Sequence, residues 1–585
     1  MNLNWDLSDF YNGFSDPQYI QDKERLNSVQ LNISEIIDNN KDTELTLEEI
    51  IRASEELTHL LTRLFNYVQL TLSTNSTHEI ALKELDSLSQ LQVSAMLTSS
   101  KMTRFIGKTN NLLDYIQNNK FLKEYEFFLL EEQHNNQHQL PENKEKVLLN
   151  MSLSGGDAFS KLRDRLMGDH TVEYEDKQMP LSYVRGLAYD SDANVRKNAY
   201  KAECASYAKV ETPMAFCISS IKREANTLCK EKNFNSVLEE QLYFSRMDKE
   251  TLNAMLDAIK DALPIFQTYL KAKAKHLGHK NGLPFYDLFA PISSDSLRYT
   301  PQEARDLLIS TFTSVDKQMG DFIKEAYDGN WIDLCPKEGK QGGAFCCGNY
   351  QLKQSRILSN FMGSFSDVST LAHELGHAWH DRCLTNVPVL LTNIPMSLAE
   401  TASIFNETLL NKAVRENADE QTKLSLLENS LMEATQTVVD IYSRFLFESK
   451  VVEESKKMIP TPEMLNKWMI EAQIMAYGDG LDKDYLNSGM WVNKGHYYDT
   501  NLHFYNFPYA FGHLFSLGIF NKYQQLGAEF MPVYHKLLAG CGSASVAGVA
   551  EQVGINVRSK SYWESALNVI KEEVNAFVAL LNKKV

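Results

Sequence analysis

Hydrophobic and polar residues follow a helical period along most of the chain. Apolar side chains recur at intervals of three and four positions among charged and amide residues, which is typical of helices with one buried face. The polar stretch 134–145 interrupts this pattern and is predicted to be a loop. The pattern therefore indicates a mainly α-helical protein. Helices are predicted over residues 44–65, 78–108, 111–134, 195–230, 249–276, 302–327, 421–455, 462–476 and 560–582.

A run with three histidines, Leu-Ala-His-Glu-Leu-Gly-His-Ala-Trp-His, occupies residues 371–380. His373 and His377 are four positions apart, so on a helix their imidazoles project from one face and can hold a single metal ion. Glu374 lies beside them and is suited to accept a proton from an attacking water. Short polar residues precede the run and favour a helix start, so the motif helix is predicted over 367–381. The alternative is a surface helix that carries two histidines and a solvated glutamate.

Two histidines do not complete a catalytic zinc site, which usually has three protein ligands. A metzincin would place a glycine and a third histidine after the motif, but this chain has His380 and Cys383 there. Glu400 lies in an apolar stretch, residues 395–407, that is compatible with a helix. A carboxylate among such neighbours is costly to bury unless a positive charge meets it. We therefore predict Glu400 as the third ligand of one Zn²⁺ ion per chain. Glu407 either orients a ligand histidine or is simply exposed.

A possible strand pair precedes the motif. Residues 342–350 and 356–361 have the composition of two short strands joined by a turn, and a second small hairpin is predicted within 172–180. An exposed strand edge can bind a peptide backbone by adding a strand, and glycine lets that backbone approach closely. Gly343 and Ala344 are therefore predicted to contact substrate. The alternative is a purely structural hairpin.

Several blocks around the motif match one known family in order. These blocks are residues 5–11, 192–200, 286–291, 367–380, 400–403, 496–498 and 504–512. Through them the chain resembles the oligoendopeptidase F family, within the wider thimet oligopeptidase-like zinc peptidases. The resemblance implies two helical lobes that enclose a deep substrate channel, with a small β-sheet beside the zinc helix. It places an N-terminal helical lobe at 1–194 and a catalytic zinc-peptidase domain at 195–585.

The C-terminal block contains a dense group of tyrosines and histidines. Peptide hydrolysis builds negative charge on the carbonyl oxygen, and Tyr and His are suitable donors to it. The resemblance implies that His496 and Tyr505 contact the substrate or the oxyanion, and that Tyr509 and Tyr498 help to bind substrate. The alternative is that several of these aromatics are core residues. His503 lies outside the matched positions and is predicted to be a bystander.

Composition narrows the choice of partners and compartment. With 59 basic and 76 acidic residues among 585, the net charge of −17 argues against broad binding to nucleic acids or anionic membranes. The polar start of the chain has no signal-peptide pattern, and no apolar run of about 18 residues predicts a membrane span. The eight cysteines form no CxxC pair and are predicted to be free thiols. We therefore expect a cytoplasmic protein.

The leading hypothesis is a zinc endopeptidase that uses metal-activated water with Glu374 as the general base. Short peptides are the expected partners, a preference that rests on the resemblance. One alternative keeps the zinc site but makes the enzyme an exopeptidase of the peptidyl-dipeptidase or carboxypeptidase type. The other is a non-catalytic peptide-binding protein, which leaves Glu374 without a purpose. The sequence does not indicate the oligomeric state.

Overall fold

The structure is a computed structural model that describes residues 2–39, 42–292 and 297–583. Helices predominate among these residues, and the strands form one two-stranded and one three-stranded sheet. The predicted mainly α-helical fold is therefore confirmed. The chain divides into two compact units. Unit 1 comprises Met1–Gln139, Leu297–Val414 and Lys522–Gly554, and unit 2 comprises Leu140–Ser296, Arg415–Asn521 and Ile555–Val585.

Each unit contains segments from both halves of the sequence, because the chain passes between the units several times. The predicted boundary between residues 194 and 195 lies inside unit 2. A separate N-terminal lobe at 1–194 therefore stays a prediction.

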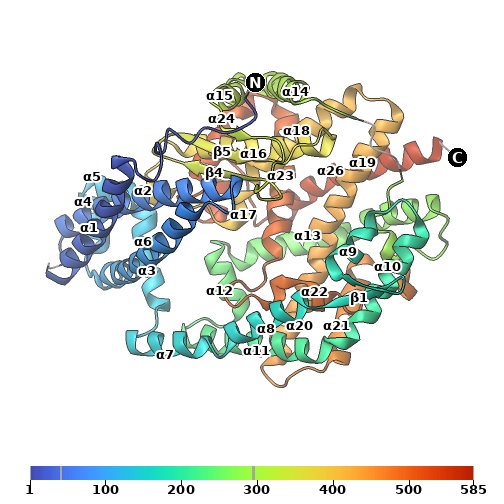
Figure 1. Ribbon diagram of the computed structural model, residues 1–585, viewed down its shortest axis with the longest axis horizontal. Helices are drawn as coiled ribbons and strands as arrows, with labels where there is room; N and C mark the ends of the chain where they lie inside the picture. Colours follow the sequence, from blue (N-terminus) through green and yellow to red (C-terminus); the bar gives the residue numbers. More distant parts are fainter. Residues whose placement is uncertain (1, 40–41, 293–296, 584–585) are drawn as a thin grey trace. The chain divides into compact units, whose positions relative to one another are not determined.

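The first helices of unit 1 pack against one another as a three-helix bundle (Figure 1). They are α1 (Pro17–Asn39), α2 (Glu44–Thr74) and α3 (Glu79–Lys108). Their apolar faces meet in a core of leucines, valines and tyrosines that includes Leu64 and Tyr67. The predicted helix 111–134 is instead three short helices, because Asn119 is extended and caps a new start by accepting from the N–H groups of Phe121 and Leu122. These helices are α4 (Leu112–Asn118), α5 (Lys120–Glu124) and α6 (Glu126–Asn135).

The three-stranded sheet of unit 1 supports the motif helix. Its strands are β3 (Ile332–Asp333), β4 (Phe345–Asn349) and β5 (Gln354–Leu358), in the order β3-β5-β4. Strands β4 and β5 pair antiparallel, so the predicted hairpin forms, and β4 is an edge strand. The motif helix α16 (Phe365–Leu384) packs against both strands (Figure 1). The other helices mostly or wholly in unit 1 are α14 (Pro301–Val315), α15 (Lys317–Asp328), α17 (Met396–Ala399), α18 (Thr401–Asn417), α24 (Met531–Gly540) and α25 (Val546–Glu551).

Unit 2 packs long helices around a second core. The predicted small hairpin forms here from β1 (Thr171–Tyr174) and β2 (Lys177–Pro180). The core includes Ile218, Phe447 and Trp491, all buried. The helices mostly or wholly in this unit are α7 (Glu142–Ser152), α8 (Gly156–Gly168), α9 (Leu181–Gly186), α10 (Ala193–Ser206), α11 (Glu211–Glu231), α12 (Val237–Phe244), α13 (Lys249–His276), α19 (Glu420–Ala434), α20 (Ile441–Ser455), α21 (Pro462–Tyr477), α22 (Met490–Asn493), α23 (Phe507–Leu526) and α26 (Lys560–Lys583).

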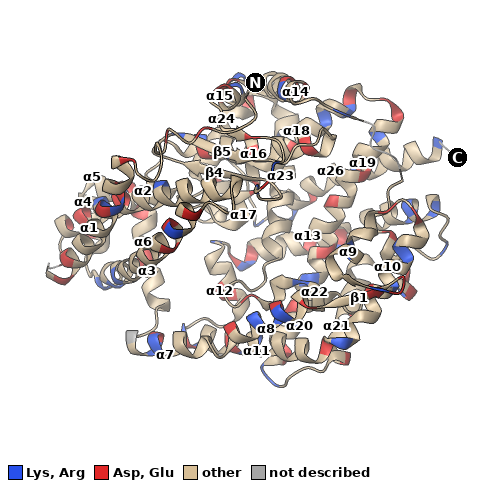
Figure 2. Cartoon of the chain, viewed as in Figure 1, with Lys and Arg blue, Asp and Glu red and all other residues tan. Residues whose placement is uncertain are grey.

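Charged side chains of both signs are distributed over the helices of each unit (Figure 2). Within the described part of the chain, every helix is too short or too polar to cross a bilayer. The eight cysteines are all free thiols, as predicted.

Candidate active site

The motif helix α16 begins with a capping box. The side chain of Ser364 accepts a hydrogen bond from the backbone N–H of Asp367, and the Asp367 carboxylate accepts one from the N–H of Ser364. This reciprocal pair satisfies two of the donors that a helix start leaves without partners. The helix therefore starts slightly before the predicted 367–381. It carries His373, Glu374 and His377 in its middle, where the backbone is fully hydrogen-bonded.

A close helix contact brings the predicted third ligand to the histidines. Gly376 faces α18 so closely that a Cβ atom there would lie 2.6 Å from the carbonyl oxygen of Ala402 and 2.6 Å from the Cα of Ser403. The apolar stretch 395–407 was predicted to be compatible with one helix. The structure instead has two helices, and Glu400 lies in the break between α17 and α18. The Ser403 hydroxyl donates to Glu400 Oε2 at 2.7 Å and holds the carboxylate near the break.

The three predicted ligands converge. His373 Nε2 lies 3.1 Å from His377 Nε2, and Glu400 Oε2 lies 3.3 Å from the first nitrogen and 3.5 Å from the second. Tetrahedral zinc with bonds of about 2.0–2.1 Å separates its ligand atoms by about 3.3 Å. These residues therefore fit a metal of this size, and they form a group that can hold an ion. On the other side of the ring, Glu407 Oε1 lies 3.5 Å from His373 Nδ1, where it can orient the ligand.

The electrostatics of this group favour a cation. Burial alone would lower the pKa of His373, but hydrogen bonds with Glu400 and Glu407 outweigh it and raise this pKa to about 11. Burial lowers the pKa of His377 to about 4. Burial opposes ionisation of Glu400, but His373 and His377 together lower its pKa to about 2. These shifts favour a protonated His373 ring between the carboxylates of Glu400 and Glu407. A metal ion bound by the three residues would supply the positive charge in place of that proton.

Glu374 follows His373 on α16 and faces the cavity beside the two histidines. It is buried, with 6% of its surface exposed, yet it lines a cavity of about 400 Å³ together with His373 and His377. Burial raises the pKa of Glu374 to about 7, although His373 opposes the shift. A carboxylate with a pKa near neutrality can both accept a proton and release it.

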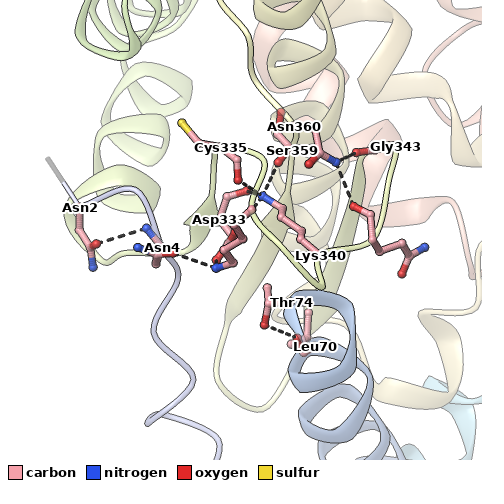
Figure 3. A network of polar contacts seen from close by, with 12 residues as sticks. Asn2, Asn4, Leu70, Thr74, Asp333, Cys335, Lys340, Gly343, Ser359 and Asn360 are labelled. Atoms are coloured by element: carbon pink, nitrogen blue, oxygen red, sulfur yellow. Dashed lines mark hydrogen bonds and ion pairs between the residues drawn. The ribbon is translucent and has the colours of Figure 1, made fainter. Parts of the chain in front are cut away.

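The predicted hairpin forms one wall of this cavity. Ala344 lines the cavity, whereas the Gly343 carbonyl accepts a hydrogen bond from Asn360 Nδ2 at 2.8 Å (Figure 3). A buried ion pair holds the loop before β4, since Lys340 Nζ lies 2.8 Å from Asp333 Oδ1 and also donates to the carbonyl oxygens of Asp333 and Cys335 (Figure 3). The loop that precedes β4 is therefore held by several hydrogen bonds and one buried ion pair.

One edge of β4 pairs with no other strand among the described residues. Ile357 and Ser359 donate their N–H groups toward β3, so by alternation Arg356 and Leu358 bond to β4. The N–H and C=O of Cys346 consequently point away from β5. The neighbouring carbonyl of Gly348 accepts a hydrogen bond from Asn66 Nδ2 at 2.8 Å.

In unit 2, three of the predicted C-terminal residues form one aromatic group. The His496 ring centroid lies 4.8 Å from that of Tyr505, in an edge-on arrangement, and stacks at 6.4 Å on Tyr509. The two tyrosine rings are 5.4 Å apart. His496 is exposed and both tyrosines are half-buried, so the group presents polar atoms at the surface of the unit.

Tyr498 is a core residue. Only 1% of its surface is exposed, and its hydroxyl donates to the carbonyl oxygen of Trp491 at 3.2 Å. This placement argues against the predicted contact of Tyr498 with substrate, because the hydroxyl is already bonded within the core.

His503 has a structural role that the sequence did not reveal. It is buried, and its Nδ1 lies 3.1 Å from Lys222 Nζ, which also pairs with Glu448 at 2.7 Å. Glu448 in turn accepts from the Phe504 N–H and from Asn506 Nδ2, at 2.9 and 2.8 Å. This network holds the residues on both sides of Tyr505. No local motif in the sequence pairs Lys222 with these positions.

Comparisons with known proteins identify the family of this chain. The model of Peptidase family M3 matches residues 186–569, and that of Oligopeptidase F matches residues 109–171. Oligopeptidase PepF of Bacillus subtilis is 23% identical over 99% of this chain and 87% of its own length. An oligoendopeptidase F homolog of Borreliella burgdorferi is 22% identical over 97% of both proteins.

Solved structures show the same architecture. A protein of Chlamydophila abortus aligns with a TM-score of 0.88 at 21% identity, covering 99% of this chain and 98% of the other. Oligoendopeptidase-F of Enterococcus faecium aligns with a TM-score of 0.69 at 18% identity, covering 97% and 99%. Because the family match covers most of the chain, this protein belongs to peptidase family M3, the metallopeptidase family of the oligoendopeptidase F enzymes that it was predicted to resemble.

Proposed function

We propose that this protein is a cytoplasmic zinc endopeptidase that hydrolyses internal bonds of short oligopeptides. The observation that carries the proposal is the convergence of His373, His377 and Glu400 within 3.1–3.5 Å of one another, beside the cavity that Glu374 lines. Membership of peptidase family M3 supports peptide cleavage by a metallopeptidase. The names of the relatives support short peptides as substrates.

His373, His377 and Glu400 would hold the zinc ion, and Glu407 would orient the His373 ring from behind. Zinc supplies Lewis-acid polarisation of the scissile carbonyl and lowers the pKa of water. Glu374 accepts the proton of the attacking water and passes it to the nitrogen of the leaving amine. Its pKa of about 7 suits both steps, since a general base and acid works best near the ambient pH.

His496 and Tyr505 are proposed to donate hydrogen bonds to the negative oxygen of the reacting carbonyl, with Tyr509 contacting the substrate. Their mutual ring contacts and the network that holds the Tyr505 segment support a preorganised donor group. One such donor contributes on the order of 10²–10³ in rate.

The edge of β4 is proposed to bind the substrate backbone, next to Gly343 and Ala344. Main-chain hydrogen bonds at such an edge recognise peptides of many sequences. The anchored loop before β4 supports a rigid binding edge rather than one that must be ordered on binding.

The decisive experiment compares the intact chain with Glu374→Gln and Glu400→Ala, using an internally quenched peptide. The intact chain is expected to turn over, to stop with a chelator and to recover with zinc. Glu374→Gln should retain zinc but lose about 10²–10⁴-fold in kcat, because the base is removed while the ligands remain. Glu400→Ala should lose zinc on dialysis. A fully active, zinc-loaded Glu374→Gln enzyme would remove Glu374 from its assigned role.

Product masses from one peptide blocked at both ends distinguish the endopeptidase from an exopeptidase. Internal cleavage of the blocked peptide is expected, whereas a carboxypeptidase or peptidyl-dipeptidase needs a free terminus. A comparison of casein with short peptides tests the preference for oligopeptides. A protein that binds peptides without turnover in any of these assays would instead be a binding protein.

A further inference from the structure

Asp381 is a carboxylate beside the active site that the proposed mechanism does not use. It lies on α16 four residues after His377, which places it about 6 Å further along the axis and about 40° around from that ligand. It lines the same cavity as His373, Glu374 and His377. Asp381 therefore faces the space in which a substrate would lie.

The carboxylate of Asp381 is only partly satisfied. Ser355 Oγ donates to its Oδ2 at 3.0 Å, and Cys346 Sγ lies 3.8 Å from the same oxygen. Its Oδ1 has no hydrogen-bond partner in the part of the chain that the structure describes. Burial raises the pKa of Asp381 to about 7, because these neighbours do not offset the loss of water. A cation from outside would stabilise the charged form.

The Asp381 carboxylate occupies space that is open because residue 348 is a glycine. A Cβ atom at Gly348 would lie 2.4 Å from Asp381 Oδ2, so any larger residue there would displace the Asp381 side chain. Gly348 and Cys346 both lie on the face of β4 that meets Asp381. The carboxylate thus occupies a site that the strand accommodates, rather than a chance position at the surface.

The cavity contains carboxylates but no Lys or Arg among its described lining residues. The next residue, Arg382, turns away and pairs with Glu325 at 2.8 Å. His380 also lines the cavity, but burial lowers its pKa to about 3, so it is neutral. The described lining of the cavity therefore contains the carboxylates of Glu374 and Asp381 but no Lys or Arg that could pair with Asp381.

Alternate residues of β4 face Asp381. Cys346 and Gly348 face α16, while Phe345 and Cys347 face the α1–α3 core on the other side. A peptide that adds to the edge of β4 opposite β5, beside Cys346, would continue this alternation, so that every second side chain would point to the cavity side of the sheet.

We infer that Asp381 forms a subsite for a cationic group of the peptide substrate, either a Lys or Arg side chain near the scissile bond or a free α-amino group. The inference rests on the proposed peptidase function and names the substrate class that this site prefers. A cation entering the cavity would bond to Asp381 Oδ1, which has no partner of its own within the described residues.

The test uses pairs of quenched peptides in which one position at a time carries lysine or norleucine, which has a straight chain without charge. Each pair is compared in two assays: kcat/KM with the zinc-loaded chain, and Kd by fluorescence anisotropy with the Glu374→Gln variant. A second arm compares free with acetylated N-termini and thereby separates the α-amino group from the side chain as the source of the cation. We expect a preference of about tenfold for the charged peptide in one of these arms, the order of a charge-assisted hydrogen bond.

Asp381→Asn keeps the shape and removes the charge, so the preference ratio should fall to within about twofold of unity. Asp381→Glu should retain it. Glu325→Gln removes a carboxylate outside the cavity and is the matched control, with an unchanged ratio. Equal use of lysine and norleucine peptides by the intact chain would overturn the inference, even if a variant failed to fold. Absence of all cleavage would refute the proposed function, while the Kd ratios would still decide the role of Asp381.

Discussion

Glu400 reaches the histidines because it lies at a break between helices. Inside a continuous helix its side chain would follow the helix surface, whereas the turn between α17 and α18 lets the carboxylate project toward α16. The hydroxyl of Ser403 then fixes one of its oxygens. The carboxylate is awkward to bury among apolar residues, and this is what identified Glu400 in the sequence. The break itself left no clear signal there.

Glu407 provides a residue-scale prediction. Its carboxylate lies 3.5 Å from His373 Nδ1, so Glu407→Gln should weaken zinc binding by about 10–100-fold, because the ring loses the partner that sets its orientation and basicity. Competition with a chelator of known affinity measures the change. Glu416→Gln on the exposed side of the same helix is the control. An unchanged affinity in Glu407→Gln would show that the ring needs no such partner.

At the scale of elements, the site depends on how closely two helices approach. Gly376 has no side chain, and the backbone of α18 lies directly against it. The approach carries both Glu400 and Glu407 to His373, and Asn406 Nδ2 adds a hydrogen bond to the carbonyl oxygen of Ala372 at 3.3 Å. A single small residue therefore sets the distance between the histidine helix and the carboxylate helix.

Gly376→Ala tests this dependence. The added methyl group would lie 2.6 Å from the backbone of α18, so the helices must separate or shift. We expect a loss of about 1–3 kcal/mol of stability, as for other overpacked cores, together with at least tenfold weaker zinc binding. Thermal unfolding and chelator competition measure the two effects. Gly168→Ala, where a Cβ would meet nothing within 4 Å, is the control and should change neither. Normal zinc affinity in Gly376→Ala would mean that the helix spacing is not critical.

The network of Lys222 and Glu448 that holds the residues around Tyr505 also joins separate elements. Lys222 on α11 and Glu448 on α20 are fully buried and meet residues 503–506 between α22 and α23. Burying such a pair is costly unless each partner is well bonded, so this pairing serves to define one conformation. It could not be predicted from the sequence, because its members are separated by more than 200 positions.

At the scale of the whole molecule, buried neutral histidines contribute to the loss of stability in acid. Burial lowers the pKa of His513 to about 4 and that of His380 to about 3, from an ordinary value of 6.5. As the pH falls below 6.5 the unfolded chain binds protons at these positions and the folded chain does not. Stability is therefore present above pH 6.5 and is lost as the pH falls toward 4.

The expected loss is about 1.4 kcal/mol per pH unit for each such histidine. His513→Gln should reduce the slope of unfolding free energy against pH by roughly one proton between pH 4.5 and 6. Urea unfolding at a series of pH values measures this slope. The exposed His276 provides the control variant, His276→Gln, since its ring is open to water in the folded state. An unchanged slope in His513→Gln would show that His513 is protonated in the folded chain.

Local chemistry in the sequence was enough to predict the mainly helical fold, the hairpin and the convergence of His373, His377 and Glu400. Helical spacing alone places His373 and His377 on one face, and side-chain chemistry alone makes Glu400 costly to bury without a cation. These properties depend on neighbouring positions, so they can be read along the chain.

Tertiary structure decided the rest, because it depends on residues far apart in the chain. The approach of α18 to Gly376 places Glu400 within 3.5 Å of both histidines, and the packing of β4 on α16 turns Asp381 into part of a cavity wall. Tertiary packing also buries Tyr498 in the core and places His503 beside Lys222 in a network of charged residues. Period and composition report whether a residue prefers water or the core, but only the folded chain determines which partner it meets there.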